Sequence, residues 1–238
     1  MLCGRRCARR EEKNIGRRAF AARERIKMKK SELNKLFNLA LKNNIKQYPI
    51  KSRGGILYKK EGDYLVSFLL LVSDFKHKNF NGSSLIKPFI ADDVFWEVFK
   101  MESNRSEPIS LRANGAFTVD GLKVFAKHEI YNDVEDFDRM IKEFLEESNK
   151  IVSNIIGTFC NFDDYLLFSK TIEKKGLFDY ELMKMLLLIY DGNYEKAKKL
   201  ALEQLSDRKM GRFQNEGKWI YEHVVDYCNL HKGEKIEW

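Results

Sequence analysis

The strongest constraint on the fold is a change in hydrophobic period near residue 133. Before this point, short apolar runs are separated by turns that contain Gly and Asp, a pattern typical of strands. After it, apolar residues recur every three or four positions over long stretches, which is the period of amphipathic helices. Strands followed by helices, instead of alternating units, predict an α+β fold. We expect a small antiparallel sheet with flanking helices, followed by an all-α C-terminal helical part.

Two strands are predicted to form the centre of the sheet. Residues 56–60 and 64–72 flank a turn that contains Gly62, which is typical of a hairpin. The second run is apolar almost without interruption, so both of its faces should be covered. A helix over 31–44, capped by Ser31, is expected to precede this hairpin.

The remaining strands are predicted from weaker signals. The polar stretch 74–84 indicates a loop, and Pro88 places a short strand over 85–90 towards an edge of the sheet. The pair Asn114-Gly115 indicates a turn or a bulge between two more strands. Further strands are therefore expected over 109–113, 116–119 and 122–130.

The second half of the chain is predicted to be helical. Helices are expected over 133–156, 162–174, 180–190, 194–206 and 212–230. The helix over 180–190 is apolar nearly all round, so it should lie at the centre of the helical part. We therefore predict an α+β domain over 28–157 and a helical C-terminal subdomain over 158–238.

The N-terminal thirty residues carry the positive charge of the chain. They hold twelve of the 43 Lys and Arg and three of the 35 acids, which leaves 31 basic and 32 acidic residues elsewhere. Three interpretations are open: a basic arm for nucleic acid or anionic lipid, an organelle transit peptide, or sequence translated upstream of a start at Met28. We favour the third, because residues 24–27 can be encoded by a purine-rich ribosome-binding run. Residues 1–27 are then a non-native basic head, and nucleic acid is expected as a partner only if they are native.

Motifs for common cofactors and metals are missing from the sequence. It contains no phosphate-binding glycine loop, no HExxH, no CxxC and no GxSxG, so we expect no cofactor, no metal and no catalytic residue. The longest apolar runs fall short of the roughly 20 residues that a membrane helix needs. Outside the head, only Cys160 and Cys228 occur, which favours a reducing, cytoplasmic location. Cys160 is expected to be buried, and each His to lie at the surface or its boundary.

Acidic residues gather at the predicted helix starts. Asp92-Asp93, the acids over 133–138 and Asp163-Asp164 all stand where free backbone N–H groups attract carboxylates. We therefore interpret these three groups as helix caps first, and as candidates for acid–base chemistry only second.

One acidic stretch is long enough to suggest a binding surface. Residues 129–147 hold eight acids against Arg139 and Lys142. The electric field of these acids steers a positively charged partner towards the surface. An ordinary solvated helix face has the same composition and is the alternative interpretation. The candidate partner-binding residues are Glu135, Asp136, Glu143, Glu146 and Trp96. The tryptophan, or else Trp219, is expected to be an exposed aromatic anchor.

The alternative candidate is a ligand site around Arg112. If residues 109–113 form a strand beside the helix that follows residue 92, Arg112 lies near Asp92 and Asp93. This arrangement suits an anionic ligand in a small-molecule-binding or enzymatic α+β domain with a cleft there. An ordinary salt bridge on the sheet surface explains the same residues.

The segments Asp92-Asp93-Val94-Phe95-Trp96 and 110–117 together resemble a class of bacterial α+β proteins of unknown function. Some of these are immunity or accessory partners of secreted toxins. The resemblance covers residues 31–150, depends on their layout and assigns no functional residue. It implies a non-enzymatic cytoplasmic binding protein, an immunity-type inhibitor of a basic protein partner, and this is the function that we predict from the sequence.

Overall fold

The computed structural model describes residues 28–74, 77–172 and 178–231 of the chain. Within these ranges the fold is α+β: a five-stranded antiparallel sheet with helices against it, and more helices in the C-terminal part. The predicted fold class is therefore confirmed. The head over 1–27, with its three interpretations, lies outside the described residues.

The sheet follows the order of the chain. Its strands are β1 (Lys51–Arg53), β2 (Ile56–Glu61), β3 (Tyr64–Asp74), β4 (Lys78–Pro88) and β5 (Leu122–Ile130). Each strand pairs antiparallel with the next one, so β3 is the central strand, as predicted. The expectation that both of its faces are covered is wrong for its second half, where Leu71 and Ser73 are exposed. The hairpin turn at Gly62 is also where the sequence predicts it, and its positive φ of 56° is a conformation that glycine adopts without strain.

Helices account for most of the other described residues. They are α2 (Lys30–Asn44), α3 (Ile90–Val98), α4 (Ser110–Asn114), α5 (Asp136–Ile156), α6 (Phe162–Thr171), α7 (Tyr180–Tyr190), α8 (Tyr194–Ser206) and α9 (Ile220–Leu230), with short 3-10 helices over Ile45–Gln47 and Glu102–Ser106. The helices predicted over 180–190 and 194–206 match α7 and α8 at both ends. Ser31 lies inside the first turn of α2 and does not cap it.

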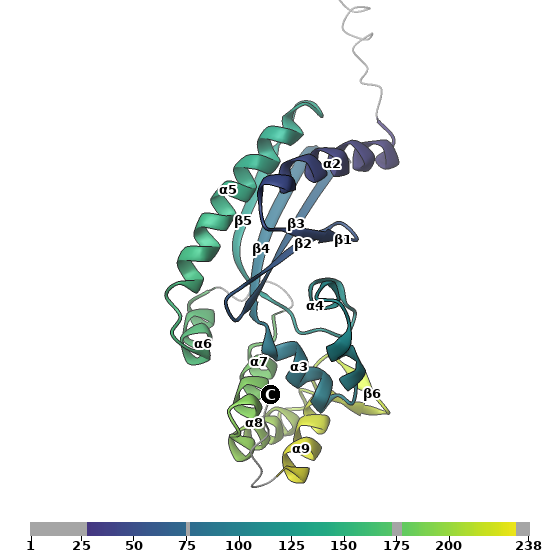
Figure 1. The fold of residues 1–238 in the computed structure, drawn as a ribbon. Helices are drawn as coiled ribbons and strands as arrows, with labels where there is room; N and C mark the ends of the chain where they lie inside the picture. Colours follow the sequence, from purple (N-terminus) through teal and green to yellow (C-terminus); the bar gives the residue numbers. More distant parts are fainter. Residues whose placement is uncertain (1–27, 75–76, 173–177, 232–238) are drawn as a thin grey trace, which may run out of the picture.

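The inner face of the sheet is covered by α5, which runs along it, and by α2, which lies across the upper end of the sheet in Figure 1 and contacts α5. The ring of Phe37 on α2 lies 6.2 Å from Phe80 on β4 and 5.3 Å from Phe137 on α5, measured between centroids. At Gly82 a Cβ atom would collide with the Phe144 ring of α5. The missing side chain therefore lets α5 approach β4, and any larger residue there would push the helix away.

Among the described elements, α4 covers one end of the outer face of the sheet and leaves the other end open (Figure 1). Leu71 and Ile130, on the uncovered part, are 67% and 64% exposed. The loop predicted over 74–84 is wrong, because β4 begins at Lys78. Its polar residues Asn81 and Ser83 point to this uncovered face, and an uncovered face does not need apolar side chains.

Two further strand predictions are wrong. Residues 85–90 are not an edge strand, since β4 lies between β3 and β5, and Pro88 is the last residue of β4, where a missing N–H disturbs no further pairing. The strands expected over 109–113 and 116–119 are instead α4 and an irregular segment. The pair Asn114-Gly115 ends this short helix and does not turn a hairpin.

The C-terminal helices pack against α3, which comes from the first half of the chain. Helix α3 contacts α7 and α9, and α7 lies at the centre of the helical part, as predicted. The helix predicted over 212–230 begins only at Ile220. A short hairpin of β6 (Gln214–Asn215) and β7 (Lys218–Trp219) precedes it, and Glu216 and Gly217 turn that hairpin with φ values of 47° and 77°. The buried apolar side chains of both halves form one continuous core, and the separate domains divided at residue 157 stay a prediction.

Candidate functional site

A buried ion pair joins β4 to α3. Lys87 Nζ lies 3.0 Å and 2.8 Å from the two carboxylate oxygens of Asp92, and the two side chains are 5% and 0% exposed. The same ammonium donates to the backbone oxygens of Arg112 and Val119, both at 2.8 Å. Asp92 in turn accepts the backbone N–H of Val119 at 3.0 Å. The pair therefore fastens α4, and the segment that follows it, to the sheet and to α3.

Burial opposes the charge on both members of this pair. It lowers the pKa of Lys87 and raises the pKa of Asp92, while the contact between the two groups acts in the opposite direction on each. Three hydrogen-bond acceptors surround Nζ, which matches the three donors of an ammonium group. The geometry thus fits a charged lysine that is held by its neighbours and is not free to react.

Arg112 forms a second buried contact beside the first. Its Nη2 donates to Asp93 Oδ1 at 2.6 Å, and its guanidinium carbon lies 4.2 Å from the Phe89 ring centroid and 4.7 Å from that of Trp96. The Arg112 side chain is 6% exposed. The structure therefore brings the predicted ligand-binding residues Arg112, Asp92 and Asp93 together. It places Arg112 on a helix, however, and in a buried cluster instead of on a sheet surface.

Trp96 is not an exposed aromatic residue. Its side chain is fully buried, and its indole N–H donates to the backbone oxygen of Phe117 at 2.6 Å. The expectation that Trp96 anchors a partner from the surface is therefore wrong, because the ring packs beneath Arg112 on the inner side of α3. Trp219, the other aromatic residue considered, is half-buried in β7.

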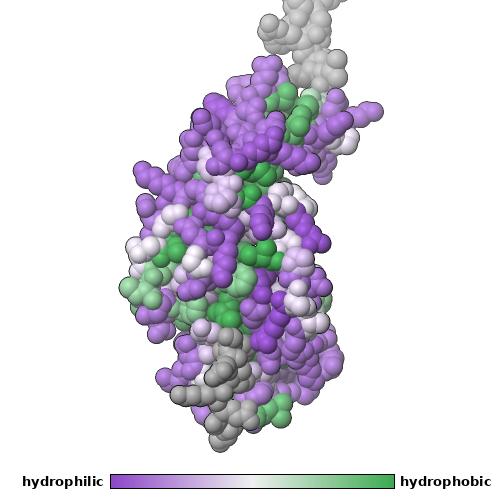
Figure 2. All heavy atoms as spheres, in the orientation of Figure 1, coloured by the Kyte–Doolittle hydropathy of each residue, from purple (hydrophilic) through white to green (hydrophobic). Residues whose placement is uncertain are grey.

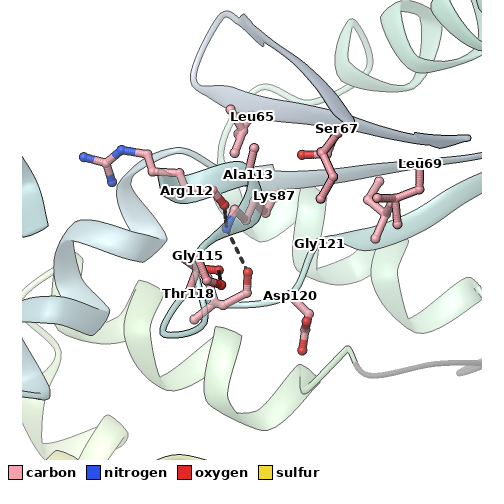
Figure 3. A pocket seen from close by; sticks show the side chains of 13 residues that line it. Leu65, Ser67, Leu69, Lys87, Arg112, Ala113, Gly115, Thr118, Asp120 and Gly121 are labelled. Atoms are coloured by element: carbon pink, nitrogen blue, oxygen red, sulfur yellow. Dashed lines mark hydrogen bonds between the residues drawn. The ribbon is translucent and has the colours of Figure 1, made fainter. Parts of the chain in front are cut away.

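A cavity of about 210 Å³ lies between the outer face of the sheet and α4. Figure 3 shows strand residues such as Ser67 and Leu69 on one side of it and Gly115 and Thr118 on the other. The guanidinium of Arg112 points away from this space, so only the rest of that residue lines the wall. The cavity is smaller than the roughly 300–1,000 Å³ of most small-molecule sites, and the hydroxyls of Ser67 and Thr118 are among its polar groups.

The predicted acidic stretch forms a surface on and beside α5. We call it the acidic surface; it comprises Glu129, Asp133, Glu135, Asp136, Asp138, Glu143, Glu146 and Glu147. Arg139 lies 2.5 Å from Glu129 and 3.2 Å from Glu143. Lys127 lies 3.4 Å from Glu143. These cations screen the middle of the surface.

Negative charge remains after this pairing. Within residues 28–74, 77–172 and 178–231, the cations in ion-pair contact with the acidic surface are Lys127, Arg139 and Lys142, against eight acids. Hydrogen bonds from the backbone N–H groups of Asn132 and Asp133 hold the pKa of Asp136 below its usual value. Partial burial acts against ionisation of Glu143, but hydrogen bonds from Arg139 and Lys127 outweigh it and lower the pKa of Glu143. These carboxylates are therefore charged at neutral pH.

The acids at helix starts have different structural roles. Asp136 accepts the backbone N–H groups of Asn132 and Asp133 before α5, and Asp164 accepts that of Cys160 before α6, so both hold the chain that enters the helix. Neither is the predicted helix cap, because the side chain of Asn161 caps α6 and α5 has no side-chain cap. Asp92 does not hold the entering chain in this way, because its side chain contacts Lys87. No sequence motif surrounds Lys87, and only the position of this lysine next to Pro88 in an apolar run could have indicated that Lys87 is buried.

Two smaller expectations are also wrong. Cys160 is exposed, because it lies in the turn between α5 and α6 and not within a helix. His223 is buried in α9, where its ring lies 5.1 Å from that of Phe99 and its Nε2 lies 3.0 Å from the backbone oxygen of Asn215. Packing thus fixes this histidine in place.

In the ranges that the structure describes, no group of three or more His, Cys, Asp or Glu side chains is arranged to hold a metal ion. No helix in these ranges is both long enough and apolar enough to cross a membrane. Comparisons of the chain with known protein families, with characterised proteins and with solved structures found no match. Any function must therefore be argued from the geometry.

Proposed function

We propose that the chain is a non-enzymatic binding protein of the bacterial cytoplasm that binds a positively charged protein partner through the acidic surface of α5, as an immunity-type inhibitor of a basic toxin would. The observation that carries this proposal is the excess of carboxylates on this surface over the three cations that contact them among the described residues. An excess of this kind raises the rate of encounter with a basic partner and disfavours acidic ones.

The exposed positions on this surface support the proposal. Glu135 is exposed, and the side chain of Glu146 is 56% exposed, with a single long contact of 3.9 Å to Lys142. Solvent-exposed pairs of this type contribute little to stability, so exchanging Lys142 for a cation of a partner costs the fold little. The free thiols Cys160 and Cys228 suit a reducing compartment such as the cytoplasm.

Reversal of charge on the acidic surface tests the proposal. A partner captured on the immobilised full chain from a bacterial lysate, and then purified, provides the binding measurement. We expect the double variant Glu135→Lys/Glu146→Lys to slow association by about tenfold or more at low ionic strength, because steering depends on the summed charge. We also expect added salt to reduce the difference between this variant and the unaltered chain.

A matched control reverses the same number of charges elsewhere. Glu203 is exposed on α8, and Asp207 follows that helix; both contact only a lysine near them in the chain. Glu203→Lys/Asp207→Lys should leave the association rate within about twofold of that of the unaltered chain. Equal slowing by both double variants would show a general effect of net charge, and it would contradict binding at α5.

The cavity beneath α4 favours a second candidate function, the binding of a small molecule. Its walls are held in place by the buried pair of Lys87 and Asp92, so the space is preformed. This candidate predicts that a screen of small compounds finds ligands that raise the melting temperature of the unaltered chain and not of a Ser67→Phe variant, in which the ring fills the cavity. If the screen finds only ligands that stabilise both proteins equally, the cavity is not their site.

A further inference from the structure

Four aromatic side chains line a second pocket, at the C-terminal end of α5. The pocket has a volume of about 260 Å³, and its aromatic wall consists of Tyr64, Phe159, Phe162 and Tyr190. The Tyr64 ring centroid lies 5.5 Å from that of Phe159 and 5.9 Å from that of Phe162. The rings of Phe162 and Tyr190 are 5.7 Å apart. The four rings come from β3, α6, α7 and the connection after α5, so only the folded chain assembles them.

Three carboxylates stand at the rim of this aromatic pocket. They belong to Asp63 in the β2–β3 turn, Asp163 in the first turn of α6 and Asp191 directly after α7. All three residues are exposed. In the described part of the chain, none of their side chains makes an ion pair or a hydrogen bond. The rim therefore carries negative charge that no side chain among the described residues neutralises through an ion pair.

The rim carboxylates produce the negative field at the pocket. Burial, and then the nearby charge of Asp163, raise the pKa of Asp191, so these two carboxylates repel each other. The C-terminal end of α7 and the N-terminal end of α6 both lie at this pocket, so the opposite partial charges of the two helix ends offset each other and the negative charge comes from the carboxylates. A cation placed between the rings would relieve the repulsion.

Aromatic walls select the kind of cation. A small metal ion needs several oxygen, nitrogen or sulfur ligands within reach of one point, and the described residues form no such group here. An ammonium or guanidinium group on an organic chain, in contrast, gains from the faces of aromatic rings and from carboxylates at their edge. The pocket thus suits an organic cation with an apolar stem.

We propose that the aromatic pocket binds the side chain of a lysine or arginine that a basic protein partner presents. This inference rests on the proposed function, and it supplies the aromatic anchor that the buried Trp96 cannot provide. Glu146 precedes the end of α5 by ten residues, which is about 15 Å along a helix. One partner can therefore contact both the acidic surface and the pocket.

Titration of the full chain with a small probe tests the pocket directly. The probe is N-acetyl-lysine methylamide, and the neutral comparison is N-acetyl-norleucine methylamide, which has the same stem without the ammonium group. We expect saturable changes in the backbone NMR signals of Asn161, Asp163 and Asp191 with the lysine probe. The norleucine probe should bind at least about tenfold more weakly. Equal binding of both probes, or no saturable change with either, would overturn the inference.

Variants separate the contributions of charge and rings. Asp163→Asn/Asp191→Asn keeps the shape of the rim and removes two charges, so the affinity for the lysine probe should fall by about tenfold or more. Phe162→Leu keeps apolar bulk and removes one ring, and a smaller loss of a few fold is expected. The matched control is Asp207→Asn on an exposed residue away from the pocket. An unchanged affinity in the double variant, with an unchanged melting temperature, contradicts a site built on these carboxylates.

Two more outcomes are decisive. If tetramethylammonium binds and the lysine probe does not, the pocket takes a free quaternary cation, and the assignment to a protein side chain is overturned. Protection of the Cys160 thiol from alkylation by the lysine probe would support the site, since this exposed cysteine lines the pocket. The result differs if the proposed function is wrong and the pocket is real. In that case Glu135→Lys/Glu146→Lys leaves the rate of partner association unchanged, while the lysine probe still binds the pocket.

Discussion

Two pairs of adjacent aspartates, Asp92-Asp93 and Asp163-Asp164, begin helices in similar ways and have opposite roles. In α3 both side chains are drawn into the interior, where Asp92 contacts Lys87 and Asp93 contacts Arg112. In α6 one member accepts the backbone N–H of Cys160, while the other remains exposed at the rim of the aromatic pocket.

The difference between the two pairs lies in what packs over each helix. Helix α3 lies between the sheet and the C-terminal helices, so the carboxylates in its first turn are shielded from water and each needs a cation beside it. Helix α6 lies at the edge of the molecule, beside the lower end of α5 in Figure 1, and water can solvate its acids. Buried acids therefore organise the fold here, whereas exposed acids without a partner remain available for binding. Figure 2 shows that hydrophilic side chains cover most of the visible face, so charge alone does not mark such a site.

Removal of one member of the buried pair should have the largest effect. Lys87→Met leaves the carboxylate of Asp92 in the interior without a cation, and the cost of an uncompensated buried charge is about 3–5 kcal/mol of unfolding free energy. Urea denaturation measures this loss. The double variant Lys87→Met/Asp92→Leu removes both charges and should regain most of it. If the loss of unfolding free energy in the double variant equals the sum of the losses in the two single variants, the charges themselves, and not their pairing, stabilise α3.

The second buried contact should matter less, because Arg112 also packs between two rings. Asp93→Asn removes the charged partner and keeps a hydrogen-bond acceptor, so we expect a loss of about 1–3 kcal/mol. Thermal unfolding followed by circular dichroism measures this loss. An unchanged melting temperature would show that the stacking of Arg112 on Phe89 and Trp96 alone holds α4 in place.

The two acids of α6 should differ from each other. Asp164→Ala removes an acceptor for the backbone N–H of Cys160, so stability should fall by about 1 kcal/mol. Asp163→Asn changes an exposed side chain with no partner among the described residues, and its effect should stay within about 0.5 kcal/mol. Both values come from the same denaturation experiment. A larger loss at Asp163 than at Asp164 would reverse the roles that we assign to them.

The two free cysteines allow a comparison of an exposed and a buried position without a substitution. Burial raises the pKa of Cys228 to about 12, so this thiol should resist alkylation in the folded protein. Cys160 is exposed and should react readily with iodoacetamide. Peptide mass spectrometry at neutral pH distinguishes the two sites. Rapid modification of Cys228 would show that α9 opens more readily than its packing implies.

Helices and strands were predictable from the sequence where a single hydrophobic pattern indicates both their type and their position. The bounds of α7 and α8 follow from helical periodicity, and the central position of β3 follows from its unbroken apolar run. Prediction failed for the first half of β4, since Asn79, Asn81 and Ser83 face the uncovered side of the sheet and carry polar groups. It also failed for α4, because the sequence of a turn after a helix resembles that of a turn between strands.

The candidate sites were predictable only in part. The acidic surface is local in sequence, so a count of charges within one stretch finds it. The aromatic pocket combines residues as far apart as Tyr64 and Tyr190, and no local pattern indicates that these rings meet. For the same reason the prediction of Trp96 as a surface anchor is wrong, because the exposure of a side chain depends on what packs over its helix and not on the helix alone.

The most direct test of the proposed binding mode is zero-length crosslinking of the full chain to its captured basic partner. A carbodiimide joins a lysine of the partner to a carboxylate only where the two are in contact, and mass spectrometry identifies the carboxylate. We expect crosslinks at Glu135 or Glu146 on the acidic surface, and at Asp163 or Asp191 on the pocket rim. Crosslinks confined to acids elsewhere, such as Glu203 and Asp207, would contradict both the proposed function and the pocket.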